Sequence, residues 1–494
     1  MITNMPQFIK NFTFGKLSLI KLSMLLLTTL TLLSIESIAQ SITWQRAYDG
    51  KYNSLDVSED ICDAVNGNFF IVGTTELRES YYALTVLKIN QFGDTLWWRY
   101  KDSAVGKAIV STGDGGCIVT GLRNKPFTMK IDSAGNTVWF KEYPGSTVFS
   151  GLDIIRTIDS GYIMCGTVSY DSAFIAKLDN NGNFIWQKSF GAGNRKSFRK
   201  IIETDDGKLY AFGYLNQTSA DTTRALITKL SNSGNMITER TFVMNGITGI
   251  NDSKKTGSGF VICGDTYDGT HFRVFYKLIN LDLSDSYTRV FNSDVSESDA
   301  RIAVVNNNRF VFSAARLTSA FPGGFRFYTK TFVTDSLGNI LVERNFNAFG
   351  DLYINSILTL PSGDIMFAGY GELALFPVEA DIYLIRTDSV LNSPPLIGIN
   401  NEGIFIPETY SLHAFPNPFN PETNISIILP QRSKIKLILY DLLGRELEVI
   451  MDGELGKGKH QWSWKPINLS SGVYFLQLKT SEGYSNTIKL LLLK

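Results

Sequence analysis

The sequence predicts an all-β protein in which a seven-bladed β-propeller is closed by an N-terminal strand and followed by a small β-sandwich. Three observations predict this architecture. A unit of about 50 residues, containing four β-patterned runs, recurs between residues 54 and 392. The last unit lacks its fourth run, and a matching run stands near the N-terminus. The final part of the chain, 412–494, has a different composition and several short alternating runs.

The first 39 residues, 1–39, are predicted to be a signal peptide. Three lysines precede an apolar stretch, "LSMLLLTTLTLLSI" at 22–35, and Ala39 stands at a small-residue position that a signal peptidase reads. We therefore expect cleavage between Ala39 and Gln40. The alternative is a membrane anchor, but this stretch is shorter than the roughly 20 residues that a spanning helix needs. No later run is long enough either, so we expect no transmembrane segment in the mature chain.

The charge balance gives no reason to expect a nucleic-acid or membrane-surface partner. The chain has 47 basic and 47 acidic residues, and removal of the signal peptide, with three Lys and one Glu, leaves 44 against 46. The four Cys and three His are scattered along the chain. We therefore expect the Cys to be small core residues, and we predict no disulfide framework, no metal site and no cofactor.

One repeat unit, 151–191, shows the internal pattern most clearly. It reads "GLDIIRTIDSGYIMCGTVSYDSAFIAKLDNNGNFIWQKSFG" and contains four runs of alternating apolar residues between turn signals. The residue that ends the second run recurs at intervals of 45 to 54 residues: Gly73, Gly121, Gly166, Gly213, Gly264, Ala315 and Gly369. Seven units of four strands are typical of a β-propeller.

The N-terminal strand is expected to complete the last blade. The seventh unit, 352–392, has three runs and ends before a fourth. The missing run is "ITWQRAYDG" at 42–50. Its Trp44 matches a Trp that recurs in three other units, at Trp97, Trp139 and Trp186. Pairing this strand with the last blade replaces an open seam by a continuous ladder. The alternative, that it caps blade one, leaves the seventh unit incomplete, so we assign 40–392 to a closed propeller.

The pattern K-x-D-x-x-G-x-x-x-W around these Trp residues resembles the tryptophan-docking repeats of quinoprotein propellers. The resemblance covers about a dozen residues per blade and implies packing between neighbouring blades with a satisfied indole N–H. It implies no quinone cofactor. The turn "DNNGN" at 179–183 lacks the alternating carboxylates and distal Glu of an EF-hand calcium loop, so we interpret it as a β-turn.

One face of the propeller is the expected binding surface. In a four-stranded antiparallel blade, the first and third turns lie on one face, and the second turn and the connection between blades lie on the other. The second loops are long and varied, as binding loops on a rigid scaffold usually are. They and their flanks supply the candidate binding residues, each of which also fits an ordinary solvated loop position: Arg78, Tyr81, Arg123, Arg224, Tyr267, His271, Phe321 and Phe376.

No catalytic motif stands out, so we name no catalytic residue. The chain contains no G-x-S-x-G, H-E-x-x-H or P-loop pattern. We therefore expect a binding or adhesion module for an extracellular glycan or protein ligand rather than an enzyme. The alternative is a secreted polysaccharide hydrolase or lyase. Carboxylates that converge at the central channel would favour that alternative.

The C-terminal module is expected to be a small β-sandwich. Residues 393–411 are rich in Pro, Gly and Asn and are interpreted as a linker. The following module, 412–494, has alternating runs near 424–429, 434–440, 445–451, 459–464, 472–479 and 485–493.

This module resembles the type A sorting domain of the type IX secretion system. The resemblance is carried by "PNPFNPET" at 416–423, "YDLLGRE" at 440–446, Trp462 or Trp464, "LSSGVYFLQL" at 469–478 and "KLLLLK" at 489–494. The module is also similar to the immunoglobulin-like domain of flagellar hook-capping proteins, but the signal peptide favours sorting. The resemblance implies an immunoglobulin-like fold and, as partners, the type IX secretion machinery and its sortase. It implies export through the periplasm and a secreted or cell-surface protein.

Overall fold

The computed structural model describes most of the propeller and of the sandwich. The described residues are 42–50, 55–78, 81–123, 125–143, 148–168, 172–191, 195–217, 222–244, 246–306, 308–319, 325–346, 351–372, 380–394, 410–415, 417–429, 431–456, 458–466 and 469–493. The predicted signal peptide, with Ala39 and Gln40, lies outside them.

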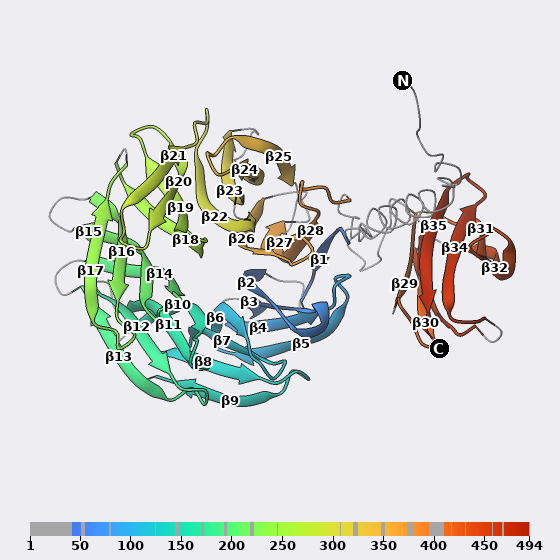
Figure 1. Ribbon diagram of the computed structural model, residues 1–494, viewed down its shortest axis with the longest axis horizontal. Coiled ribbons are helices and arrows are strands. Elements are labelled where there is room, and N and C mark those ends of the chain that lie inside the picture. Colours follow the sequence, from blue (N-terminus) through green and yellow to red (C-terminus); the bar gives the residue numbers. More distant parts are fainter. Residues whose placement is uncertain are drawn as a thin grey trace, which may run out of the picture. The chain divides into compact units, whose positions relative to one another are not determined.

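Seven four-stranded antiparallel sheets form the blades of a propeller, with the first strand of each blade toward the centre (Figure 1). Blades one to three contain β2 (Asp56–Asp63), β3 (Phe69–Arg78), β4 (Tyr81–Ile89), β5 (Thr95–Asp102); β6 (Val105–Ser111), β7 (Cys117–Leu122), β8 (Pro126–Ile131), β9 (Thr137–Glu142); and β10 (Val148–Arg156), β11 (Tyr162–Val168), β12 (Ser172–Leu178), β13 (Phe184–Phe190). A single turn of 3-10 helix, η1 (Val65–Gly67), joins β2 to β3.

The later blades repeat this order of strands. Blades four to six contain β14 (Arg195–Glu203), β15 (Leu209–Gln217), β16 (Thr222–Leu230), β17 (Met236–Phe242); β18 (Thr248–Lys255), β19 (Gly259–Tyr267), β20 (Phe272–Asn280), β21 (Asp285–Val290); and β22 (Glu297–Asn306), β23 (Arg309–Ser319), β24 (Phe325–Asp335), β25 (Ile340–Phe346). Blade seven contains β26 (Leu352–Thr359), β27 (Ile365–Glu372), β28 (Ala380–Thr387) and, as its outermost strand, β1 (Trp44–Tyr48).

The position of β1 confirms that the N-terminal strand closes the ring. It pairs antiparallel with β28, from Trp44 opposite Arg386 to Tyr48 opposite Ile382. The Trp44 Nε1 donates a hydrogen bond of 3.0 Å to the Gln91 carbonyl oxygen in blade one. The Tyr48 hydroxyl donates one of 2.7 Å to a carbonyl of the same turn. The N-terminal strand thus belongs to the last blade and also contacts the first.

The other Trp residues of the repeat also lie against the third turn of the following blade. Trp97 donates from Nε1 to the Ser133 carbonyl oxygen at 3.1 Å. A Cβ atom on Gly182, which has φ 75°, would lie 2.6 Å from the Trp139 ring. The turn Gly is therefore needed both for its left-handed backbone and for the ring that covers it. In blades five and seven, whose turns lack the Gly, Leu283 and Leu391 take this conformation instead.

The Gly that ends the second strand faces a β-bulge in the first strand. In blade four the register shifts between Phe198 and Lys200, which leaves Arg199 as an extra residue. A Cβ atom on Gly213 would lie 2.0 Å from the Ser197 carbonyl oxygen. The same close approach to a first-strand carbonyl holds at Gly73, Gly121, Gly264 and Gly369. Steric exclusion of a side chain therefore explains the recurring Gly.

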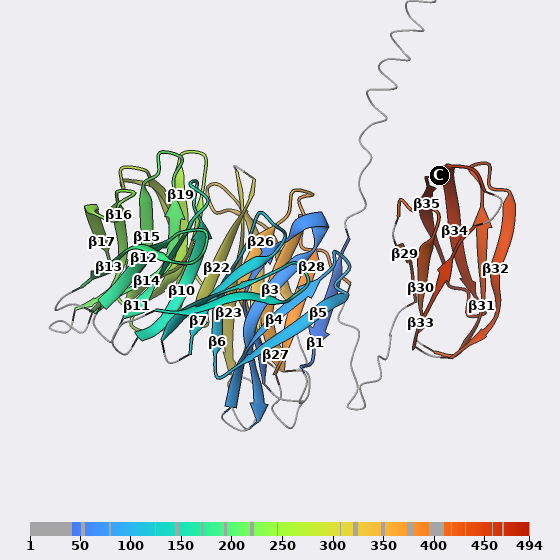
Figure 2. The same ribbon diagram turned by 90° about the horizontal axis from the view of Figure 1, so that it is seen from below.

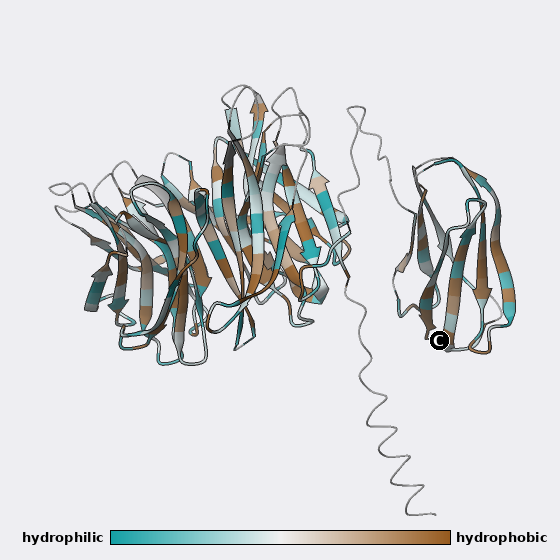
Figure 3. Ribbon diagram, turned by 90° about the horizontal axis from the view of Figure 1, so that it is seen from above, coloured by the Kyte–Doolittle hydropathy of each residue, from teal (hydrophilic) through white to brown (hydrophobic). Residues whose placement is uncertain are grey.

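The core consists of apolar clusters between adjacent blades. In one of them, Tyr276 of blade five packs with Phe310, Phe312 and Phe332 of blade six. Figure 3 shows apolar residues recurring along the strands. Cys117, Cys165 and Cys263 are fully buried and unpaired in such clusters, as expected of small core residues.

The C-terminal module consists of two antiparallel sheets (Figure 2). One contains β29 (Ser411–Phe415), β30 (Thr423–Leu429) and β33 (Gly458–Trp464). The other contains β32 (Glu446–Leu455), β31 (Ser433–Tyr440), β34 (Gly472–Thr480) and β35 (Ser485–Leu492). Leu437, Leu476 and Leu490 are fully buried in one core with Trp464, which packs against Phe419. Strand β29 was not among the predicted runs.

Trp44→Ala should weaken the closure of the ring. It removes a nearly buried ring and the hydrogen bond to blade one, so we expect the free energy of unfolding to fall by about 3 kcal/mol. Urea unfolding measures this change. Ile185→Ala, which shortens a side chain 57% exposed on the outermost strand of blade three, is the control. Equal stability of the two variants would contradict the closing role of β1.

Candidate binding site at the mouth of the channel

The candidate residues of the second loops are dispersed over separate blades. Arg123 forms an ion pair of 3.6 Å with Glu142 of its own blade. The Tyr81 hydroxyl accepts a hydrogen bond from Ser103, and the Arg224 Nε is buried without a hydrogen-bond partner. Phe321, Phe376 and the side chain of Arg78 lie outside the described part of the structure.

Tyr267 and His271 belong to one hairpin, β19–β20. The Tyr267 ring packs against Phe272 with centroids 5.0 Å apart. The His271 amide donates to the Asp268 carboxylate, which also pairs with Arg273 at 3.0 Å. No contact between described residues links candidates from different blades, so the structure does not assemble the predicted surface into one site.

Polar side chains gather instead between the innermost strands, around the central channel. The residue that follows each bulge stands at an equivalent place in every blade: Asp60, Ala108, Asp153, Lys200, Asp252, Arg301 and Ser356. An innermost strand is an edge strand, and its free N–H groups need acceptors. Carboxylates at this place can supply them.

Three aspartates join their blades to the next in this way. The Ile109, Ile201 and Ile302 amides donate to the second carboxylate oxygen of Asp60, Asp153 and Asp252 at 3.1, 2.9 and 3.1 Å. The other carboxylate oxygen also accepts a hydrogen bond. The donor is the Ser356 hydroxyl for Asp60, the Lys200 ammonium for Asp153 and the Ser253 amide for Asp252. Both oxygens of each carboxylate therefore accept a hydrogen bond from the protein.

Lys200 balances these carboxylates. Burial lowers the pKa of Lys200, but the nearby charges of Asp153, Asp252 and Asp60 outweigh it and hold the pKa above its usual value. Burial raises the pKa of Asp153 despite the Lys200 charge. For Asp252 the order is reversed: burial raises the pKa, but Lys254, Lys200 and the Ile302 amide bring it below the usual value. The channel therefore contains a coupled set of structural charges.

Nearer the second-loop face, the bulge residues form a polar rim. Arg199 of blade four donates to the Asn251 side chain at 2.6 Å, and Asn251 donates to Asp265 at 2.6 Å. The Asp299 amide of blade six donates to the same Asp265 carboxylate at 3.0 Å. Burial raises the pKa of Asp265 to about 6; the Asn251 hydrogen bond lowers it and the Asp299 charge raises it. Asp265 therefore titrates near neutral pH.

An aromatic shelf lies on the blade-six and blade-seven side of this rim. We define it as Tyr370, Tyr353 and Phe327, all half-buried. The Tyr370 and Tyr353 rings stack with centroids 5.1 Å apart, and Phe327 packs against Tyr353 at 5.3 Å. Burial, followed by the charges of Glu59, Asp299 and other carboxylates, raises the pKa of Tyr370. Aromatic faces and carboxylates therefore lie together at the mouth of the channel, which suits a ligand with both C–H faces and hydroxyl groups.

These residues were missed because contacts between blades are not visible in the repeat itself. The Gly that ends the second strand is the signal that could have found them. The first-strand residue paired with this Gly comes directly before the bulge. Counting across the short first turns from each Gly leads to the rim positions. The shelf had no such signal, because its three residues come from β24, β26 and β27.

Several solved propellers resemble the chain in structure. They include hydrazine synthase of Kuenenia stuttgartiensis (TM-score 0.47, 11% identity, 70% of this chain and 100% of that chain) and a Dos1 propeller (0.44, 11%, 74% and 100%). A third is the propeller domain of the trilobed protease of Pyrococcus furiosus (0.41, 12%, 70% and 98%). At these values no functional inference follows. No curated protein matches the chain.

The raised pKa of Asp265 predicts a pH dependence of stability. The folded state holds the proton to about pH 6, whereas the unfolded chain loses it near about pH 4. The stabilising contribution is therefore complete below about pH 4 and is lost as the pH rises through 6. Asp265→Asn should gain stability relative to the wild type across this range, by up to about 3 kcal/mol.

Urea unfolding of both proteins from acid to neutral pH measures the slope of this difference. Asp282→Asn is the control, because the Ser284 hydroxyl lowers the pKa of the exposed Asp282 carboxyl, so its slope should have the opposite sign. A difference between Asp265→Asn and the wild type that does not change with pH would contradict the assignment.

The C-terminal module matches a known family. The model of the secretion system C-terminal sorting domain matches residues 413–493. The match covers every strand of the sandwich except for the first two residues of β29. Among the described residues, no helix is long and apolar enough to cross a membrane. The module is thus a sorting domain of the type IX secretion system, and the chain is a secreted or cell-surface β-propeller protein.

Proposed function

We propose that the propeller binds an extracellular glycan at the mouth of its channel, and that the sorting domain delivers this binding module to the cell surface or the medium. The observation that supports the proposal is the aromatic shelf of Tyr370, Tyr353 and Phe327 near Glu59 and Asp299. The shelf is half-buried in a polar rim, so a ligand can reach it and be oriented there.

A sugar ring fits this chemistry well. One face of the ring carries C–H groups that pack on aromatic side chains, and its edge carries hydroxyls that donate to carboxylates and amides. The rim supplies acceptors in Glu59, whose partner is Lys107, and in Asp299, which is exposed. A protein ligand with an exposed polar loop is the other partner that this surface fits.

One observation favours a second candidate, a polysaccharide hydrolase or lyase. Three carboxylates, Asp60, Asp153 and Asp252, do lie on the innermost strands. Their oxygens are occupied by backbone amides of the next blade and by neighbouring donors, whereas glycoside hydrolysis needs two carboxyl groups that face the scissile bond. This arrangement supports binding over catalysis.

Tyr370→Ala and Tyr353→Ala should each weaken retention of the protein on its polysaccharide. Loss of one stacking ring should lower the affinity by about tenfold, equivalent to roughly 1.4 kcal/mol. Protein from residue 40 onward is tested against a panel of insoluble polysaccharides and envelope fractions. Tyr267→Ala, which removes a ring from the peripheral β19–β20 hairpin, is the matched control.

The outcomes separate the candidates. Retention that depends on Tyr370 and Tyr353 but not on Tyr267, with no new soluble products by mass spectrometry, supports glycan binding. Release of oligosaccharides would establish the enzyme instead. Retention on envelope fractions that survives removal of glycans would point to a protein ligand. Equal retention of all variants would overturn the placement of the site.

Removal of residues 411–494 should stop the protein in the periplasm. The deletion takes away the matched sorting domain and leaves every strand of the propeller in place. Fractionation of the producing cells and an antibody to the propeller measure the distribution. The converse fusion, residues 1–40 and 393–494 joined to a periplasmic reporter protein, should carry the reporter to the surface. Surface display of the truncated chain would contradict the assigned role.

A further inference from the structure

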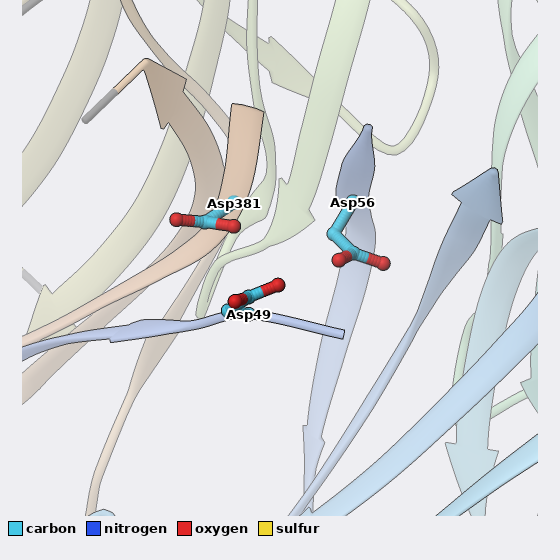
Figure 4. A group of neighbouring side chains, drawn as sticks. All are labelled: Asp49, Asp56 and Asp381. Atoms are coloured by element: carbon cyan, nitrogen blue, oxygen red, sulfur yellow. The ribbon is translucent and has the colours of Figure 1, made fainter. Parts of the chain in front are cut away.

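Three aspartates from the two ends of the propeller chain meet at the seam of the ring. Asp49 follows β1, Asp56 begins β2 and Asp381 stands near the start of β28. One carboxylate oxygen of each lies within 4.8 Å of the other two. Figure 4 shows the three carboxylates facing a common space between these segments.

The cluster lies where the ring closes. Asp49 belongs to the N-terminal segment, Asp381 to the third strand of blade seven and Asp56 to the innermost strand of blade one. Strand β1 ends, and β2 and β28 begin, on the second-loop side of the propeller. The three aspartates are therefore held by the same pairing that joins the two ends of the propeller chain.

Asp56 has an oxygen that lacks a partner. The residue is fully buried, and its Oδ2 accepts from the Gly50 amide at 2.7 Å. Its Oδ1 is buried without a hydrogen bond, and so is the hydroxyl of Thr75, which stands opposite on β3. A buried carboxylate oxygen without a donor is strongly unfavourable unless a cation or a proton satisfies it.

No compensating charge pairs with Asp49 or Asp56 in the part of the chain that the structure describes, because no described Lys or Arg forms an ion pair with either carboxylate. A bound cation would supply the balancing charge.

We propose that Asp49, Asp56 and Asp381 bind one calcium ion, which ties the N-terminal strand to the last and the first blade. Carboxylate oxygens are the ligands that hard divalent ions prefer, and Ca²⁺ accepts irregular sets of six to eight oxygens at about 2.4 Å. Two such ligands on opposite sides of an ion are about 4.8 Å apart, so oxygens within 4.8 Å of one another can share it. Water and backbone carbonyls complete such a shell.

The ion would stabilise the pairing of β1 with β28, where the propeller departs most from its repeat. In the other six blades the outermost strand follows the third strand along the chain, whereas β1 is held against β28 by noncovalent contacts alone. A ligand that binds only the closed ring stabilises it by mass action. Extracellular modules bind Ca²⁺ with dissociation constants of about 10⁻⁴ to 10⁻³ M, and we expect this range for three carboxylates in a secreted protein.

Calcium titration of protein stripped with EDTA tests the proposal. By isothermal titration we expect one Ca²⁺ per chain, and by thermal unfolding a rise of the midpoint by about 1–3 °C at about 5 mM CaCl₂ over NaCl of equal ionic strength. Asp56→Asn and Asp49→Asn should lose both effects. In EDTA both variants should unfold at or above the wild-type temperature, because each removes one of the clustered charges.

Asp179→Asn is the matched control. It removes a partly exposed carboxylate from the "DNNGN" turn of blade three and should leave calcium binding unchanged. If Asp56→Asn does not fold, Asp49→Asn carries the test, because Asp49 is exposed. Absence of binding up to 10-fold above the expected dissociation constant of about 10⁻³ M, binding that survives both seam variants, or binding of Mg²⁺ but not Ca²⁺ would overturn the proposal.

Discussion

The propeller depends on one close contact that recurs in its blades: the carbonyl of the first strand approaches the Gly of the second strand so closely that no side chain fits between them. At Gly213 a Cβ atom would lie 2.0 Å from the Ser197 carbonyl oxygen. The contact accompanies a bulge in the innermost strand, and a bulge increases the local twist and redirects the residues beside it. The bulge therefore both shapes the inner strand and places polar side chains, such as Arg199 and Lys200, around the channel.

Closure follows from a second repeated contact, in which the outermost strand of one blade covers the third turn of the next. Trp97 reaches blade two in this way, and Trp44 reaches blade one. The ring can close because an isolated N-terminal strand provides the same Trp as a complete blade. The seam differs from the corresponding place in the other blades in one respect, since its outermost strand, β1, does not follow the third strand along the chain. It is also where Asp49, Asp56 and Asp381 come together. The place where the repeat is interrupted therefore carries a carboxylate cluster that is not part of the repeat.

Periodicity made most of the fold predictable from the sequence. The recurring Gly and Trp located seven blades, and the missing run of the seventh unit identified β1. Strand β29 was missed because its five residues follow a stretch rich in Pro and Gly. The sequence predicted a binding face, which stays a prediction, and it did not point to the residues of the shelf or of the aspartate cluster. Tyr370, Glu59 and Asp299 come from three blades, and Asp49 and Asp381 are more than 300 positions apart. Such neighbours depend on ring closure, which a local pattern does not reveal.

The distribution of carboxylates bears on the choice between binding and catalysis. A catalytic carboxyl group needs an oxygen that faces its substrate, but the channel aspartates direct both oxygens to donors of the protein. Their hydrogen bonds replace the strand partners that an innermost strand lacks, so they cannot be withdrawn without exposing backbone N–H groups. By contrast, the shelf of Tyr370 and Tyr353 remains half-exposed beside acidic side chains. The polar channel is therefore explained by the requirements of the fold, and the aromatic mouth is the part of the propeller that a ligand best explains.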